Sequence, residues 1–222
     1  YRRKEGIFMS KKIDEYKMTT ILDNLYIKAL DGIPAVSKSV DELVDNYLQK
    51  NEAPDKAAKA LINNQIVKCG TSGFLTGLGG LITLPIAIPA NVSSVLYVQL
   101  RMIAAIAKIG GFDVRSDQVQ TLVYACLTGS AIADVLKRTG IKVGEKITIS
   151  AINKIPVKVL TSINQKVGFT LLTKFGTKGV VNFVKLVPLA GGVIGAAFDI
   201  GSTKIIATNA YNIFIKKQII PV

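Results

Sequence analysis

The sequence predicts an all-α protein, folded as a single compact multi-helix bundle with a Gly/Pro-rich apolar hairpin. Hydrophobic residues make up 49% of the chain and charged residues 19%, below the roughly one quarter that is typical of soluble domains. Trp is absent and aromatic residues reach only 7%, so aliphatic side chains dominate, which suits tightly packed helices or contact with lipid. The 222 residues contain no Ser-, Gly- or Pro-rich linker, so we expect one domain.

The first two predicted helices alternate charged and apolar residues, as helices of soluble proteins do. One is predicted over residues 14–30 and ends at Asp31-Gly32. Its apolar face consists of Ile21, Leu22, Leu25, Ala29 and Leu30. Ser39 and Glu42 form a capping box, which predicts the start of a second, short helix. The residues that share a face of this helix are Val40, Leu43, Val44 and Tyr47.

An uncharged segment follows a third predicted helix, which Pro54 can open and Gly70 can end. No charged residue occurs from Cys69 to Leu100. About 20 apolar residues suffice to span a membrane, but Pro85 and Pro89 argue against one straight helix. We therefore expect a bent or re-entrant hairpin, which either dips into lipid or is buried in the core of a soluble bundle. Its apolar residues are Phe74, Leu75, Leu78, Leu81, Ile82, Leu84, Pro85, Ile86, Ile88 and Pro89.

Three further helices are predicted in the rest of the chain. Asn91 is expected to cap a helix that runs to about Ile109. Ser116 is expected to cap the next helix, which we predict to run to about Arg138. After a second apolar, Gly-rich segment, a last helix is predicted over residues 200–217.

A basic region lies before that last helix. Ten Lys and Arg residues between Lys137 and Lys185 accompany a single acid, Glu145. Residues Ile152, Ile155, Ile163 and Val167 recur at helical spacing, which predicts helix rather than strand. Lysines spaced by multiples of four share one stripe wherever the helix is continuous, and we expect them to contact anionic lipid unless they form a solvated face. The lysines assigned to this contact are Lys146, Lys154, Lys158, Lys166, Lys174, Lys178 and Lys185.

The composition excludes several kinds of site. The chain has no His, which excludes a Ser–His–Asp triad, a Cys–His pair and a histidine metal site. Cys69 and Cys126 have no CxxC partner, so we expect packed thiols. The glycines around residues 77–80 and 174–179 lack the spacing of a nucleotide loop. We expect no catalytic residue, no metal and no cofactor, and few aromatic residues accompany the lysines to suggest a nucleic-acid partner.

Three charged residues interrupt otherwise apolar runs. They are Arg101, Asp134 and Asp199, and we expect them to be buried charges. An unpaired buried charge is costly, so each should have a partner or water. One hypothesis pairs Arg101 with Asp134 or Asp199, and the alternative places the acids at the surface.

Several long motifs stand in a fixed order along the chain. They are Gly73–Pro85, Gln99–Ala107, Ile163–Phe169, Thr173–Gly179, Lys185–Gly192 and Phe198-Asp199. These stretches resemble the bacterial EcsC protein family, and the resemblance extends over most of residues 21–207. The family takes its name from a protein encoded beside the ATPase and membrane subunits of an ABC transporter. The resemblance implies a position close to a membrane and supplies no catalytic residues.

The beginning of the chain suggests a non-native segment. Lys4-Glu5-Gly6 can be encoded as a ribosome-binding sequence a few codons before Met9. We therefore expect residues 1–8 to be upstream sequence and residues 9–222 to be the helical domain. No secretory signal is recognisable and the two cysteines are isolated, which favours the cytoplasm.

These observations favour a non-enzymatic accessory protein at the inner face of the membrane, peripheral or partly inserted. Its expected partners are anionic lipid and the membrane subunit of an ABC transporter, whereas its oligomeric state is not predicted. The formal net charge of +13 supports attraction to an anionic surface. A soluble helical protein with an apolar lipid-binding pocket and a membrane-damaging effector are the alternatives.

Overall fold

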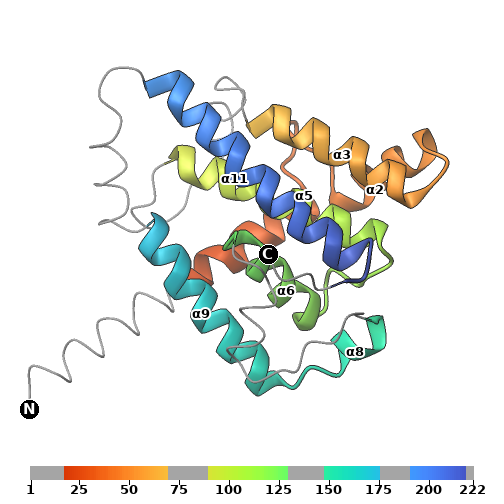
Figure 1. Ribbon diagram of the computed structural model, residues 1–222, viewed down its shortest axis with the longest axis vertical. Helices are drawn as coiled ribbons and strands as arrows, with labels where there is room; N and C mark the ends of the chain where they lie inside the picture. The colour runs from red at the N-terminus through yellow and green to blue at the C-terminus, as the bar shows by residue number, and fades with distance from the viewer. Residues whose placement is uncertain (1–17, 70–89, 130–147, 176–190, 219–222) are drawn as a thin grey trace, which may run out of the picture.

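The computed structural model confirms the all-α prediction (Figure 1). It describes residues 18–69, 90–129, 148–175 and 191–218, and within these ranges it leaves out the side chains of residues 69, 90–92, 174–175 and 191–200. The described residues form eight helices packed together and contain no strand beyond one isolated bridge between Ile33 and Ser37. The predicted Gly/Pro-rich hairpin lies outside these ranges.

The N-terminal helices agree with the predictions. A helix over residues 18–31 buries all five of the apolar residues that its spacing placed on one face. Gly32 follows with a φ of 83°, a left-handed conformation that favours glycine at the end of a helix. The next helix is α2 (Val40–Lys50), and both hydrogen bonds of the capping box between Ser39 and Glu42 are present. Its Val40 and Val44 are buried, as predicted.

The centre of the bundle is α5 (Ala90–Ile109), which packs against α2, α3 (Pro54–Cys69), α6 (Asp117–Leu127) and α11 (Gly191–Phe214). Residues 93–109 of α5 are buried except Lys108, so this helix contacts protein on all sides. The prediction that Asn91 caps α5 was wrong, because the helix already includes Ala90, a strong helix former. Pro54 is the first residue of α3, as expected.

The end of α6 differs from the prediction. Ser116 caps the helix by accepting a hydrogen bond from the Val119 amide, as expected. However, α6 ends at Leu127 and not near Arg138. Thr128 binds the Ala125 carbonyl through its hydroxyl, and Gly129 has a φ of 70°, which turns the chain out of the helix.

The C-terminal helices also depart from the predicted boundaries. The described part of the basic region, residues 148–175, contains two helices, α8 (Ile149–Asn153) and α9 (Val157–Phe175), because Pro156 lies between them and cannot continue a helix from α8. The last helix, α11, begins at Gly191 and ends at Phe214, so it starts nine residues before the predicted Ile200. Part of the Gly-rich segment is therefore helix.

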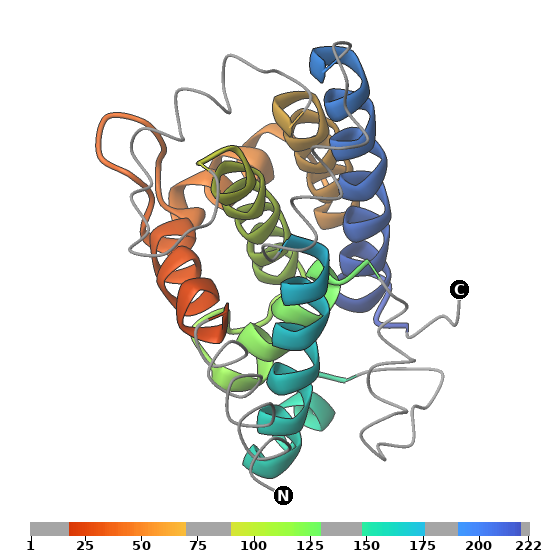
Figure 2. The same cartoon turned by 90° about the vertical axis from the view of Figure 1, so that its left-hand side faces the viewer.

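The two views show how the helices are arranged (Figures 1 and 2). The C-terminal end of α3 and the N-terminal ends of α5 and α11 point toward the upper side of the molecule in both views. Helix α9 lies along one flank, and among the labelled helices it packs mainly against α6. None of the helices in the described ranges combines the length and the hydropathy needed to cross a membrane.

Candidate functional site: a cationic arm

The strongest candidate for a functional surface is the cationic arm, which we define as residues 148–175 with helices α8 and α9. The arm contains four lysines and no acidic residue. By contrast, residues 18–69 contain six lysines and seven acids. The arm is therefore the most one-sided part of the described chain in charge.

The inner face of the arm fixes it to the bundle. Its buried aliphatic residues are Ile152, Leu160, Ile163, Val167 and Leu171. All of them except Leu160 belong to the main hydrophobic cluster, and α6 packs against both α8 and α9. Thr148 caps α8 by accepting a hydrogen bond from the Ala151 amide. Of the residues predicted to share this face, Ile152, Ile163 and Val167 are buried, whereas Ile155 lies between α8 and α9 and is only partly buried.

The outer face of α9 carries exposed apolar residues that the sequence analysis missed. Val157 is 72% exposed and Phe169 is 39% exposed. They lie on one stripe at intervals of four residues, with exposed Thr161, Gln165 and Thr173 completing it. The Thr161 and Thr173 hydroxyls donate to backbone carbonyls of their own helix, so the stripe is less polar than its sequence suggests. The sequence signal for this stripe was the recurrence of its residues every four positions, on the side of the helix opposite Ile163.

Two lysines of the arm flank this stripe near the start of α9. Lys154 and Lys158 are exposed and form no ion pair with any residue that the structure describes. Lys166 is half-buried further along α9. Lys154 follows α8 and Lys158 belongs to α9, so the predicted single stripe is interrupted at Pro156. The two lysines nevertheless lie on either side of one short turn.

The remaining predicted contact residues cannot be placed on this surface. Lys174 lies within α9, but its side chain is among those left out. Lys146, Lys178 and Lys185 fall outside the described ranges, and so do all the residues assigned to the apolar hairpin. The structure therefore describes three of the seven predicted lysine side chains.

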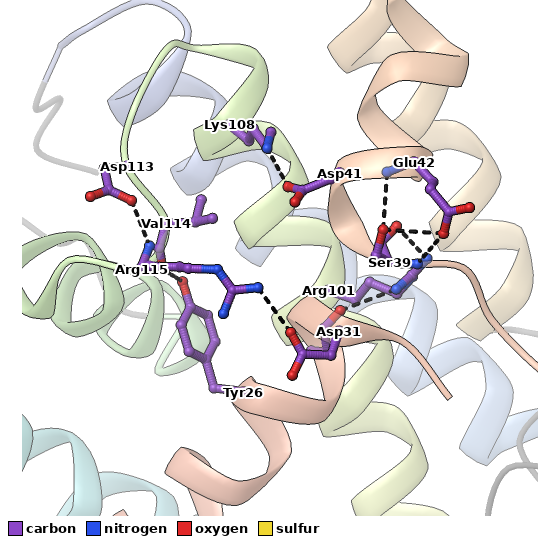
Figure 3. A network of polar contacts seen from close by, with 11 residues as sticks. Tyr26, Asp31, Ser39, Asp41, Glu42, Arg101, Lys108, Asp113, Val114 and Arg115 are labelled. Atoms are coloured by element: carbon purple, nitrogen blue, oxygen red, sulfur yellow. Dashed lines mark hydrogen bonds and ion pairs between the residues drawn. The ribbon is translucent and has the colours of Figure 1, made fainter. Parts of the chain in front are cut away.

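Arg101 is buried as predicted, being 6% exposed, and its guanidinium contacts two backbone carbonyls. It donates to the Ala29 carbonyl at 3.1 Å and to the Ser39 carbonyl at 3.4 Å (Figure 3). Burial lowers the pKa of its guanidinium, which Tyr97 and Glu42 partly offset. Asp134 lies outside the described residues and the Asp199 side chain is left out, so the hypothesis that either pairs with Arg101 stays a prediction.

The contacts around Arg101 hold the segment between the first helix and α2 in place (Figure 3). Arg115 pairs with Asp31 at 2.9 Å, and Lys108 pairs with Asp41. The Tyr26 hydroxyl donates to the Val114 carbonyl at 2.7 Å, and burial raises the pKa of this phenol. These contacts join residues far apart in sequence, so the charged residues around Arg101 have a structural role.

The described thiol and the acids offer no catalytic arrangement. Cys126 is fully buried, and burial strongly raises the pKa of its thiol, so it stays protonated and unreactive. Asp23 accepts hydrogen bonds from Tyr124 at 2.8 Å and Gln120 at 2.9 Å, which ties the first helix to α6. In the described parts of the chain, no group of three or more His, Cys, Asp or Glu residues could hold a metal ion.

Comparison with known proteins gives one match. A sequence model of the EcsC protein family matches residues 8–218, which is nearly the whole chain. No curated protein and no solved structure matches the sequence.

Proposed function

The chain belongs to the EcsC protein family, and from this premise we propose that it is a non-enzymatic, membrane-associated accessory protein that binds anionic lipid surfaces. The membrane subunit of an ABC transporter is its proposed protein partner. The cationic arm supplies the attraction to lipid, and the apolar residues of the predicted hairpin, within residues 74–89, supply apolar insertion.

The observation that carries this proposal is the combination of charge and apolar exposure on the arm. Exposed Lys154 and Lys158 stand beside exposed Val157, and no acid occurs in the arm to neutralise them. A basic helix with apolar side chains on its outer face suits the interface of an anionic bilayer. Each lysine near such a surface contributes about 1 kcal/mol, so a few of them suffice for weak, reversible binding.

The first experiment measures cosedimentation of the protein with vesicles of neutral phosphatidylcholine or of phosphatidylcholine mixed with anionic phosphatidylglycerol. Binding to the anionic vesicles alone is the expected result, with partial loss at high salt because salt screens exposed charges. Equal binding to both kinds of vesicle, or to neither, contradicts the proposal.

A matched pair of variants locates the binding surface. Lys154→Gln/Lys158→Gln removes two charges from the arm, and Lys56→Gln/Lys59→Gln removes two exposed charges from α3. The arm variant should weaken binding by about 2 kcal/mol, or roughly 30-fold, whereas the α3 variant should bind almost as the unmodified protein does. Equal losses would show that binding follows net charge and not the arm.

Insertion of the uncharged segment is tested by fluorescence, because the chain contains no Trp. Phe74→Trp places the only indole in the predicted hairpin, and Leu48→Trp places it on the exposed surface of α2. Anionic vesicles with brominated acyl chains should quench the first variant and leave the second unchanged. If neither variant is quenched while binding persists, the segment is part of the protein core and the arm alone holds the lipid.

A further inference from the structure

Helix α9 exposes apolar side chains that attraction between charges does not explain. Val157 is 72% exposed and Phe169 is 39% exposed, on the side of the helix that faces away from the bundle. Lysines alone would bring the cationic arm to an anionic surface, and polar residues at these two positions would keep the helix well solvated. The exposed apolar residues therefore need an explanation of their own.

The exposed side of α9 is broad and lies along one flank of the molecule (Figure 2). Residues four positions apart are rotated by about 40° around an α-helix, so Val157 and Phe169 point about 120° apart and are separated by about 18 Å along the axis. Lys158 points between them, because it follows Val157 by about 100°. The opposite side, which includes Ile163 and Val167, is buried against the bundle. The helix can therefore lie flat on a surface and stay attached to the protein.

The threonines on the exposed side are less polar than free hydroxyls. The Thr161 hydroxyl donates to the Val157 carbonyl at 3.0 Å, and the Thr173 hydroxyl donates to the Thr170 carbonyl at 2.8 Å. A hydroxyl proton that is already bonded loses little when water is removed, whereas an unbonded one costs free energy. The methyl groups of these threonines can therefore enter an apolar boundary. The ammonium group of Lys158 can extend to the headgroups, as lysines at membrane surfaces do.

The size of these side chains limits how deeply α9 can enter a bilayer. Its exposed apolar surface comes mainly from one valine, one phenylalanine and the methyl groups of two threonines. Amphipathic helices bind at the boundary between headgroups and acyl chains, and their binding is sensitive to curvature and lipid composition. A small apolar surface gains most where the headgroups are loosely packed and leave the acyl chains accessible. Unsaturated chains and strong curvature both loosen that packing.

We propose that α9 lies in the plane of the membrane with Val157 and Phe169 inserted, and that this insertion selects loosely packed anionic bilayers over tightly packed ones. Charge complementarity identifies the bilayer as the occupant of this face, because exposed Lys154 and Lys158 accompany it and the arm contains no acid. This selection rests on the proposed function, since the lysines must first hold the arm at an anionic surface. Insertion of the predicted hairpin, by contrast, would not depend on the side chains of α9.

Binding to vesicles that differ only in lipid packing tests the selection. Vesicles of dioleoyl or palmitoyl-oleoyl lipids, each with the same fraction of anionic phosphatidylglycerol, present the same charge with looser and tighter packing. The unmodified protein should bind dioleoyl vesicles more tightly, and small vesicles more tightly than large ones. Val157→Ser/Phe169→Ser should lose this preference and bind dioleoyl vesicles roughly tenfold more weakly. Ile27→Ser/Ile205→Ser removes two exposed apolar side chains outside the arm and should keep both properties.

Fluorescence locates the inserted side chains, because the unmodified chain contains no Trp. Phe169→Trp should be quenched by bromine atoms near the headgroup end of the acyl chains more than by bromine atoms at their far end. Ile27→Trp, exposed on the first helix, should not be quenched. Val157→Trp gives the same measurement at a position that is 72% exposed, so the test does not depend on a change at Phe169.

The outcomes separate the selection from the proposed function. Equal binding to loosely and tightly packed anionic vesicles, or an unchanged preference in Val157→Ser/Phe169→Ser, overturns the selection and leaves attraction by the lysines in place. An indole that stays unquenched at both positions while binding persists also overturns the selection, and favours a protein as the occupant of this face. Failure of the unmodified protein to bind any anionic vesicle overturns the proposed function and the selection together.

Discussion

The N-terminal side of the molecule and the cationic arm use charged residues in opposite ways. Every ion pair between described residues takes its acid from residues 18–69. Two of these pairs lie within α3 or just before it, and two connect the N-terminal side to the segment around α5 and α6. The arm has no acid, and its exposed Lys154 and Lys158 have no ion-pair partner among the described residues.

The difference indicates which charges serve the fold and which are available to a partner. Asp31 and Asp41 fix the chain between two helices by pairing with Arg115 and Lys108, so the carboxylates are already engaged. Lys154 and Lys158 form no ion pair with a described residue, and like charges close together favour the unfolded chain slightly. Charges retained without a folding role are the ones expected to meet an external anionic surface.

The largest expected effect concerns the two faces of α9. Ile163 is fully buried against the core, so Ile163→Ala should lower the free energy of unfolding by about 3 kcal/mol. Phe169→Ala changes a residue of the outer stripe and should lower it by less than about 1 kcal/mol. Urea denaturation followed by circular dichroism measures both. If the two variants lose equal stability, the outer stripe is packed against protein and is not available to lipid.

The next effect compares a buried cation, Arg101, with an exposed cation, Lys158. Arg101→Leu leaves the Ala29 and Ser39 carbonyls without their donor and should cost about 2 kcal/mol of unfolding free energy. Lys158→Leu removes an exposed charge and should change it by no more than about 0.5 kcal/mol. The effects on vesicle binding should have the opposite order. Lys158→Leu should bind more weakly, and the folded fraction of Arg101→Leu should bind almost as the unmodified protein does. An unchanged unfolding free energy in Arg101→Leu would show that the two carbonyls do not depend on this donor.

Helix caps provide a smaller contrast between the same two regions. Ser39→Ala removes the capping box of α2 and should cost about 1 kcal/mol in urea denaturation. Thr148→Ala removes the cap of α8, a helix of five residues that packs mainly against α6. Its effect should be a few tenths of a kcal/mol globally, because so short an element opens locally before the core unfolds. Amide hydrogen exchange should show the loss of protection confined to α8.

Local signals in the sequence predicted the features that depend on neighbouring residues. The capping box at Ser39 and the cap at Ser116 depend on residues three positions apart, so their geometry follows from the sequence alone. The burial of Arg101 was predicted from its apolar surroundings. Its acceptors were not, because carbonyls at the end of one helix and the start of another become neighbours only after the bundle is assembled.

The end of α6 and the start of α11 were predicted wrongly because they also depend on the assembled bundle. We predicted that α6 runs to about Arg138, where Thr139-Gly140 can end a helix, but the structure ends it at Leu127, before Thr128-Gly129. Gly disfavours helix by about 1 kcal/mol per residue, so a Gly-rich stretch is an unfavourable start for α11. The helix nevertheless begins at Gly191, and intrinsic propensity is often overridden by the rest of the fold.

The smallest expected effect is on the pH dependence of stability. Hydrogen bonds from the Ser39 amide and hydroxyl lower the pKa of the exposed Glu42 carboxyl in the folded protein, with smaller contributions from Lys38 and Arg101. A carboxyl with a lowered folded pKa stabilises the protein above its unfolded pKa of about 4.3, and this stabilisation is lost as the pH falls through the folded value. The urea midpoint should therefore decrease as the pH is lowered from about 5 to 3.

Ser39→Ala should make that decrease shallower in part, because it removes the hydrogen bond from the Ser39 hydroxyl to Glu42 and keeps the larger contribution from the Ser39 amide. A residual slope should remain from Asp55, whose pKa is lowered by hydrogen bonds from Lys59 and Tyr211. Thr148→Ala should keep the full slope, since the arm contains no carboxylate to titrate. If Thr148→Ala flattens the profile as much as Ser39→Ala does, acid sensitivity does not divide between the two regions as their charges indicate.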